Sequence, residues 1–325
     1  MDACGAGDRT EDVSNGLEGS VAVDPLAAAL ASPELAAQLC FHQEPFDAYF
    51  LSPELFRRVA PWVGATRART FKNVSPHGPL DLDLDGRDAH YWHLLVWDGQ
   101  RQVLAGSLRM ALSRWHGAEW DGQCSYLEHC YPGLDRAMAE RGLAYAEIGR
   151  TFVAPPYQRT SLALMVLLRA MASIPLATGH RHLLGMVSFN HFQHGEEVAR
   201  QFLAALCEPP FAGDLIVPPA RHPLLDLPAL GEDSGEPAAS LSLLEQQLEQ
   251  RFQEPFRVPV LLRRYLQFGN ARVVGLSLAK DFNQITEILS HCDLDQLAER
   301  QRRQFVVTDL RTVWSRDQGN GGLAG

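Results

Sequence analysis

The sequence of 325 residues lacks most features of secreted, metal-binding or membrane-spanning proteins. Its six cysteines include no Cys-x-x-Cys pair and no close cluster, which argues against a zinc ribbon or a disulfide framework and favours free thiols in a reducing cytosol. The first 20 residues lack the basic segment and apolar run of a secretory signal. The most apolar stretch, residues 162–177, contains Arg169 and Pro175 and is shorter than the roughly 20 residues that span a bilayer. We predict a buried helix there.

An excess of basic residues is also missing. Lys and Arg number 29 against 39 Asp and Glu, so the net charge is −10, which argues against a surface that follows nucleic-acid phosphates. With 46% hydrophobic and 21% charged residues, the composition is that of an ordinary globular protein. We expect a cytoplasmic protein, and a peripheral contact with the inner membrane stays open.

The chain divides into one domain with weakly packing ends. Residues 1–20 are rich in Gly, Asp and Ser, and residues 318–325 are rich in Gly, so both ends are predicted to be mobile or frayed. Between them, residues 21–317 form a single domain. Seven prolines with almost no periodicity mark residues 208–240 as a long surface excursion.

Patterning predicts an α/β fold. A helix is expected over residues 24–40, with Asp24 as its N-cap, and a β-hairpin over 92–110 around Asp98-Gly99. A strand at 144–154, a helix at 160–172 and a strand at 182–189 follow as one unit. Further helices are predicted at 196–206, 241–252, 260–268 and 294–303, and further strands at 271–278 and 285–289.

The strand at 144–154 carries the most informative residues. Glu147 and Arg150 lie in an otherwise apolar run, where each charge has a large desolvation penalty unless it faces a cleft or its opposite. Residues three apart in a regular strand point to opposite faces. The two side chains share a face only if the strand bulges, and Gly149 is the residue expected to permit that. A bulge would also free backbone N–H groups for an extended ligand. The alternative is a surface ion pair at a sheet edge.

Three strand motifs and one distant segment then resemble a known family. They are Glu147-Ile-Gly-Arg150, Gly106-Ser-Leu-Arg109, the strand that ends near Ser188, and LLRRYLQFG at 261–269 followed by Asp-Phe-Asn at 281–283. They resemble the GCN5-related N-acyltransferase superfamily, in particular its long-chain branch of ornithine lipid N-acyltransferases, N-acyl amino acid synthases and acyl-homoserine lactone synthases. The resemblance covers residues 92–289. It implies a mixed, splayed central sheet flanked by helices, with helical N-terminal and C-terminal additions.

The donor loop departs from the superfamily pattern. A Gln/Arg-x-x-Gly-x-Gly/Ala loop usually holds the pyrophosphate of coenzyme A at a helix N-terminus, but residues 158–163 contain no glycine. An acyl carrier protein has no adenosine pyrophosphate, so the departure agrees with that donor. The implied co-substrate is an acyl-phosphopantetheine thioester, on an acyl carrier protein or on coenzyme A, with no permanently bound cofactor and no metal.

The resemblance also implies roles for individual residues. Glu147 would accept the proton of the substrate ammonium, while Arg109 and Arg150 would orient a substrate carboxylate or keep Glu147 ionised. Backbone N–H groups of the bulged strand would hold the pantetheine arm or polarise the thioester. The residues implied in donor binding are Thr151, Phe152, Val153, Arg159, Thr160, Ser161 and Ser188.

Several weaker candidates remain. His191-x-x-His194 lacks the helical zinc signature and is expected to be solvated. Asp81, Asp83 and Asp85 alternate with leucines, which indicates an acidic strand face that is either solvated or an amine docking site. Asp281 is expected in a turn. One basic concentration could dock an acidic carrier protein: Arg263, Arg264, Lys280, Arg300, Arg302 and Arg303.

The predicted function is transfer of a fatty acyl group from a carrier thioester to the amine of an amino acid or related small amine. Two alternatives stay open. One is an acetyl-coenzyme-A-dependent N-acetyltransferase of a small amine, which would need only a short donor pocket. The other is a catalytically silent module that binds an acyl carrier.

Overall fold

The computed structural model describes residues 24–72, 81–115, 124–224, 237–268, 270–280 and 284–311. The two predicted tails, Asp281 and part of the excursion at 208–240 lie outside these ranges. The assignment of residues 21–317 to one domain stays a prediction.

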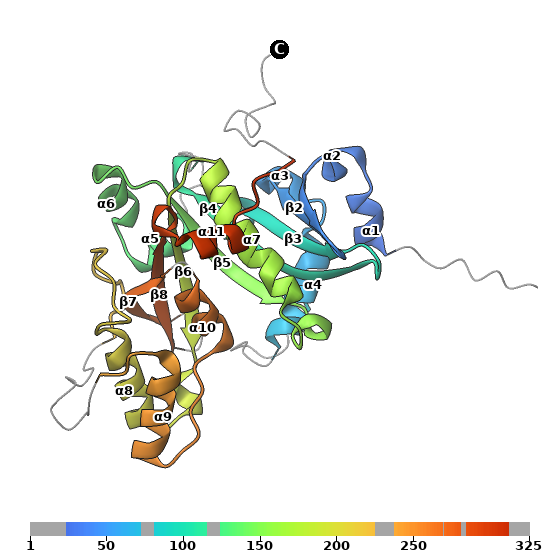
Figure 1. Ribbon diagram of the computed structural model, residues 1–325. Coiled ribbons are helices and arrows are strands. Elements are labelled where there is room, and N and C mark those ends of the chain that lie inside the picture. The colour runs from blue at the N-terminus through green and yellow to red at the C-terminus, as the bar shows by residue number, and fades with distance from the viewer. Residues whose placement is uncertain are drawn as a thin grey trace, which may run out of the picture.

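One mixed sheet of eight strands organises the described residues, in the order β1-β2-β3-β4-β5-β6-β8-β7 (Figure 1). All neighbours are antiparallel except β5 and β6, which are parallel. The predicted α/β class with a mixed central sheet is confirmed. The strands are β1 (Leu39–Gln43), β2 (Phe46–Leu51), β3 (Trp92–Asp98), β4 (Val103–Leu112), β5 (Tyr145–Val153), β6 (His182–Phe189), β7 (Arg272–Ala279) and β8 (Ile285–Asp293).

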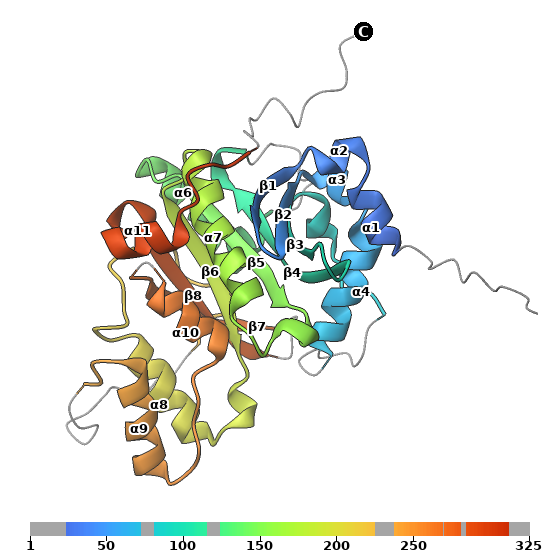
Figure 2. The same ribbon diagram turned by 45° about the vertical axis from the view of Figure 1, so that its right-hand side comes forward.

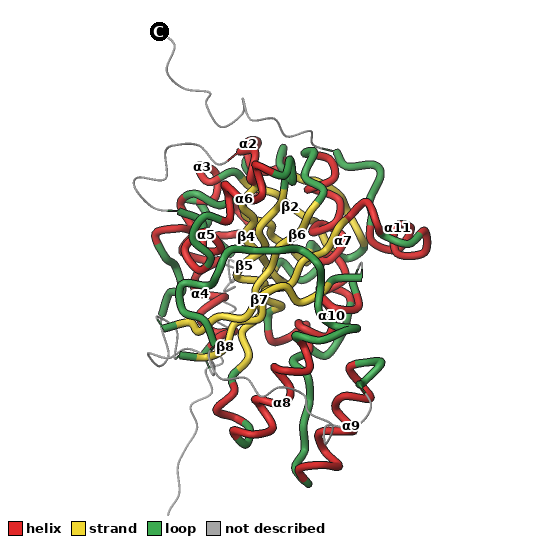
Figure 3. The backbone as a smooth tube through the Cα atoms, turned by 90° about the vertical axis from the view of Figure 1, so that its left-hand side faces the viewer, coloured by secondary structure: helices red, strands yellow, loops and turns green. Residues whose placement is uncertain are grey.

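Helices cover both faces of the sheet. On one face lie α7 (Leu162–Ala177), α10 (Val260–Gln267) and α11 (Glu299–Phe305), and on the other lie the N-terminal helices with α5 (Tyr126–Cys130) and α6 (Leu134–Glu140) (Figure 3). The N-terminal helices are α1 (Pro25–Leu30), α2 (Pro33–Ala36), α3 (Pro53–Phe56) and α4 (Ala60–Phe71). Helices α8 (Glu196–Leu206) and α9 (Leu241–Phe252) pack together beyond the end of the sheet (Figure 1).

The described residues contain no helix that is long and apolar enough to cross a membrane. The apolar segment at 162–177 is instead the helix α7, which packs against the strands of one face. Ten of its 16 residues are buried. Burying an aliphatic side chain contributes about 1.5 to 3 kcal/mol, so this helix anchors that side of the core.

The predicted N-cap at Asp24 is present. The Asp24 side chain accepts a hydrogen bond from the Leu26 N–H (2.8 Å), and at α3 the Ser52 hydroxyl accepts one from the Leu55 N–H (3.3 Å). The single helix predicted over 24–40 is wrong, because the chain ends α1, restarts at Pro33 as α2 and then enters β1. Proline has no N–H to continue a helix.

The central predictions agree closely with the structure. The hairpin is formed by β3 and β4, and β6, α8 and α9 have the predicted bounds. The helix predicted over 294–303 is a short 3-10 turn (Leu294–Gln296) followed by α11. The hairpin of β1 and β2, helix α4 and the pair α5 and α6 were not predicted. These elements have little periodicity of their own and are stabilised by packing on the sheet.

The described part of the proline-rich excursion, residues 208–224 and 237–240, contains isolated bridges but no helix or strand. Ala212 bridges to Val273 and Pro223 to Ser277, so the segment lies along β7.

Strands β5 and β6 separate halfway along their length (Figure 2). Their pairing runs from Tyr145–His182 to Ile148–Gly185, although β5 continues to Val153 and β6 to Phe189. The sheet is therefore splayed at its one parallel pair, as expected.

Candidate functional site at the diverging strands

The bulge predicted in β5 is present, but Gly149 does not cause it. On the β4 side, Ser107 pairs with Phe152 and Arg109 with Gly149. One residue of β4 therefore lies opposite two of β5, Arg150 and Thr151. Arg150 has φ 49°, so a non-glycine residue occupies the left-handed region that bulges often use. A Cβ on Gly149 would meet Arg109 only at an ordinary 3.5 Å.

Glu147 is buried at the point where β5 and β6 part. The residue is 2% exposed and accepts hydrogen bonds from the Tyr91 hydroxyl and from the Leu127 N–H at 3.2 Å. Tyr91 in turn accepts one from the Tyr126 N–H (2.8 Å). Burial and the Glu147 charge raise the pKa of Tyr91 well above its ordinary value, so this hydroxyl stays a donor. The alternative of a surface ion pair at a sheet edge is wrong, because β5 is a central strand.

The two arginines meet at an acidic loop beside Glu147. Arg109 donates to both Asp85 oxygens (2.8 and 2.9 Å) and to Asp88 (3.1 Å). Arg150 donates to Asp85 (3.1 Å). The Arg109 guanidinium also lies 4.5 Å from the centroid of the Tyr91 ring, a cation–π distance. Tyr91 thus joins the arginines to Glu147, and the bulge brings Arg150 to the same face as Arg109.

The acidic loop is held by a second buried arginine. Arg67 of α4, 2% exposed, makes a two-pronged contact with Asp88 (3.1 and 2.6 Å) and lies 3.3 Å from Asp83. Asp85 and Asp88 bond to each other's backbone N–H groups in a capping box. The acidic strand predicted from the alternation of residues 81–85 is wrong: the segment is a loop. Asp83 and Asp85 are neither simply solvated nor open for an amine, because arginines neutralise them.

Charge and burial oppose each other in this cluster. Burial disfavours the ionised form of both carboxyls, but Arg109 and Arg67 outweigh it and hold the pKa of Asp85 and of Asp88 below their ordinary values. Burial also lowers the pKa of His93 to about 3. The neutral His93 ring donates from Nε2 to the Asp88 carbonyl (2.9 Å). The site is therefore preorganised by fixed charges around the acid.

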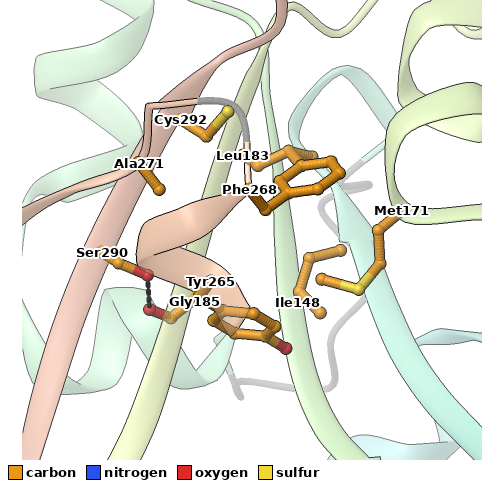
Figure 4. Close-up of a pocket in the computed structure, with 9 residues that line it drawn as sticks. All are labelled: Ile148, Met171, Leu183, Gly185, Tyr265, Phe268, Ala271, Ser290 and Cys292. Carbon is orange, nitrogen blue, oxygen red and sulfur yellow. Dashed lines mark hydrogen bonds between the residues drawn. The ribbon is translucent and has the colours of Figure 1, made fainter. Parts of the chain in front are cut away.

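A small apolar cavity lies on the opposite face, where the strands diverge (Figure 4). Its volume is about 20 Å³. Helix α10 contributes Tyr265 to the lining, and Phe268 follows directly after the helix. Both rings lie near Ile148 and Gly185 of the diverging strands. The Tyr265 hydroxyl is hydrogen-bonded to Thr151 Oγ1 (3.0 Å). The full lining is Ile148, Met171, Leu183, Gly185, Tyr265, Phe268, Ala271, Ser290 and Cys292.

The predicted donor-binding residues fall in two groups. Thr151, Phe152 and Val153 lie past the last β5–β6 pair, where among the described residues no strand pairs with that edge of β5. Arg159, Thr160 and Ser161 are exposed at the start of α7. Ser161 is its N-cap residue, without a side-chain capping bond among the described residues. Ser188 is exposed on β6, across the gap.

The two histidines after β6 have partners of their own. His191 Nδ1 is hydrogen-bonded to Thr286 Oγ1 (3.0 Å), and His194 stacks on Phe189 (5.5 Å between ring centroids). Within the described ranges, no group of three His, Cys, Asp or Glu residues is arranged to hold a metal ion.

The basic residues expected to dock a carrier lie mainly on α10 and α11. Arg263 is paired with Glu245 (2.5 Å) and Arg303 with Glu299 (2.9 Å). Arg264, Lys280 and Arg300 are exposed.

Sequence reasoning missed four members of the site: Arg67, Asp88, Tyr91 and Tyr126. Only Asp88 had a local signal, the three-residue spacing from Asp85 that is typical of a capping box. The others come from separate elements, and only folding brings them to Glu147.

The fold and this site define a class of protein. Residues 66–168 match the family model described as an acetyltransferase (GNAT) domain. The match confirms the resemblance to the GCN5-related N-acyltransferase superfamily over residues 66–168. A match of this kind supports an N-acyltransferase.

Among solved structures, the chain is similar to the AHL synthase LasI, at 11% identity and a TM-score of 0.39 over 80% of this chain and 94% of that one. It is similar to FeeM, an N-acyl amino acid synthase from uncultured soil microbes, at 11% identity and a TM-score of 0.37 over 79% of this chain and 97% of that one. It is also similar to the loading GNATL domain of CurA from Lyngbya majuscula, at 10% identity and a TM-score of 0.37 over 77% of this chain and 98% of that one. At these scores nothing about donor or acceptor follows from the likeness. Curated proteins show no match in sequence.

Proposed function

We propose that this protein is an N-acyltransferase that moves a fatty acyl group from an acyl carrier protein or coenzyme A to the amine of an amino acid or related small amine. The observation that carries the proposal is the splay of β5 from β6 beside a buried carboxylate. An extended pantetheine arm pairs with an open strand edge as an added strand would. Residues Thr151 to Val153 offer such an edge.

The proposed reaction is the aminolysis of a thioester. The amine nitrogen attacks the thioester carbonyl carbon, the C–S bond breaks, the thiolate takes a proton, and the products are an amide and a free thiol. The acceptor must first lose an ammonium proton, and Glu147 is the proposed acceptor of that proton. Arg109 and Arg150 fix the position of the acidic loop beside Glu147.

The apolar cavity is the proposed site of the acyl group. Its lining is almost entirely hydrophobic, which suits a hydrocarbon chain. At about 20 Å³ it holds little more than one water-sized group, so a fatty acyl chain requires α10 to move with Tyr265, whereas acetyl does not. The exposed arginines of α10 and α11 suit an acidic carrier protein.

The experiment that tests the proposal supplies acyl thioesters of two to sixteen carbons, on carrier protein and on coenzyme A, with a panel of amino acids. Mass spectrometry detects the amides, and thiol release gives the rate. Glu147→Gln keeps the shape of the side chain and one of its two acceptor oxygens but removes the base, and we expect turnover to fall by about a hundredfold or more with donor binding little changed.

The matched control is Asp98→Asn. Asp98 is equally buried, at 2% exposed, and accepts bonds from the Tyr157 hydroxyl and the Arg101 N–H, away from Glu147. Its turnover should stay near that of the wild type. Equal turnover in Glu147→Gln would remove Glu147 from the mechanism, and amide formed only from acetyl donors would favour the acetyltransferase alternative. Donor binding without any amide would favour the silent module.

A further inference from the structure

The gap between β5 and β6 opens at one end of the sheet. The two strands are parallel, so their last residues, Val153 and Phe189, lie at the same end, beyond the last pair at Ile148 and Gly185. Within the described residues, no strand fills the space between them there. We call this end of the gap, between Val153 and Phe189, the mouth.

An exposed apolar side chain follows each of the two strand ends. Helix α7 begins at Leu162, and the turn before it is tied to β5 by a hydrogen bond from the Gln158 side chain to the Val153 carbonyl (3.0 Å). Phe192 comes three residues after Phe189, the end of β6. Leu162 is 51% exposed and Phe192 is 66% exposed. Both sides of the mouth therefore present a large apolar group to solvent.

Helix α10 adds a third exposed apolar side chain at the same end. Phe268, directly after the helix, lines the same cavity as Leu183, near the start of β6 (Figure 4). Tyr265, closer to the N-terminus of the helix, is hydrogen-bonded to Thr151 near the end of β5 (3.0 Å). The helix therefore runs along the gap and begins at the mouth, where Val260 is 69% exposed.

This grouping is not a general property of the surface. Among the described residues, four large apolar side chains are more than half exposed, and three of them are Leu162, Phe192 and Val260. The fourth is Ile216, at 78%, whose carbonyl accepts a hydrogen bond from Arg141. Arg141 precedes the start of β5, at the other end of the sheet. Single exposed apolar residues are ordinary, but three around one opening mark an interaction surface.

Two arginines accompany these apolar side chains. Arg159 comes three residues before Leu162, and Arg264 lies one helical turn after Val260, on the same side of α10. Both arginines are exposed, and neither has an acidic partner in the described ranges. Apolar groups flanked by arginines are complementary to a lipid bilayer, because its hydrocarbon accepts the apolar groups and its phosphates bind the arginines.

Resting on the proposed function, we infer that the mouth is a contact surface for a lipid bilayer. Leu162, Phe192 and Val260 insert between the lipids, and Arg159 and Arg264 bind phosphate headgroups. A fatty acyl amide formed in the gap then passes into the bilayer without exposing its chain to water. An acidic carrier protein would match the arginines but not the three apolar side chains, so the observations favour the bilayer.

Vesicle flotation tests the contact in the absence of any substrate. The vesicles contain phosphatidylcholine and phosphatidylglycerol in equal parts. Leu162→Ser, Phe192→Ser and Val260→Ser should each lower the partition coefficient about tenfold, the effect of withdrawing one apolar side chain from hydrocarbon. Ile216→Ser is the matched control, because it removes an equally exposed apolar group at the other end of the sheet, and its partition coefficient should equal that of the wild type.

The arginines are tested on two kinds of vesicle. Arg159→Gln and Arg264→Gln should each lower the partition coefficient about fivefold on the mixed vesicles, the effect of one basic residue near an anionic surface. On pure phosphatidylcholine the two variants should differ from the wild type by less than twofold. All the substituted side chains are exposed, and urea unfolding confirms that each variant is folded; an unfolded serine variant is replaced by the alanine variant at the same position.

The outcomes separate this inference from the proposed function. Wild-type protein that does not float, or serine variants that all float within twofold of the wild type, would overturn the bilayer contact. Unchanged flotation with a raised KM for carrier thioesters alone would also overturn it and assign the surface to a carrier protein. Wild-type protein that floats through these residues but forms no amide would refute the transferase and leave the bilayer contact intact.

Discussion

His93 makes the stability of this protein depend on pH, and the size of the effect follows from its surroundings. The ring is 1% exposed and stacked on Phe56, with 3.3 Å between ring centroids. Burial lowers its pKa from 6.5 to about 3. Below pH 6.5 the unfolded chain therefore binds a proton that the folded protein does not bind, so the free energy of unfolding falls as the pH falls.

The magnitude comes from the width of that window. One pKa unit corresponds to about 1.4 kcal/mol, so His93 contributes about 2 kcal/mol of lost stability between pH 7 and pH 5 and about 5 kcal/mol below pH 3. Replacement by Phe keeps a ring against Phe56 and removes the titration. The expected result is a urea unfolding curve whose midpoint shifts less with pH in His93→Phe than in the wild type.

His291 provides the control for this measurement, because burial lowers its pKa to about 4 and it lies in β8, away from His93. His291→Phe should leave the His93 share of the slope in place. If the wild type and His93→Phe lose the same amount of stability between pH 7 and pH 5, then His93 takes up a proton in the folded state. That result would refute the argument that burial keeps the ring neutral.

Two further predictions concern the diverging strands. Tyr265→Ala should enlarge the apolar cavity, lower the free energy of unfolding by about 3 kcal/mol and shift the preferred thioester donor toward longer acyl chains. Tyr265→Phe loses only the hydrogen bond to Thr151 and should keep the wild-type preference for chain length. An unchanged preference in both variants would show that Tyr265 does not form the end of the pocket. Gly149→Ala should leave the midpoint of urea unfolding nearly unchanged. Gly106→Ala should lower that midpoint, because its Cβ would lie 2.8 Å from the Phe152 carbonyl oxygen. A larger loss of stability in Gly149→Ala than in Gly106→Ala would contradict the placement of the bulge at Arg150.

Local patterns predicted the central elements well. Alternating apolar residues and Asp98-Gly99 specify the β3–β4 hairpin, and helical periodicity specifies α7, α8 and α9, because these segments carry enough apolar surface to define a face by themselves. The same reasoning failed at residues 81–85, where alternating Asp and Leu imitate a strand. The conformation of that segment depends on ion pairs with three arginines outside it: Arg67, Arg109 and Arg150.

The sequence by itself determined the α/β class and the position of Glu147 in a strand, and it predicted a bulge there, since each depends on neighbours in the chain. Only the tertiary structure decided that this strand is central in the sheet, that Arg150 carries the bulge and that Tyr91 and the Leu127 N–H contact Glu147. Those contacts join β5, α5 and the residue that precedes β3. Burial of a charge has a large cost until its partners arrive, and the partners come together only when the whole sheet forms.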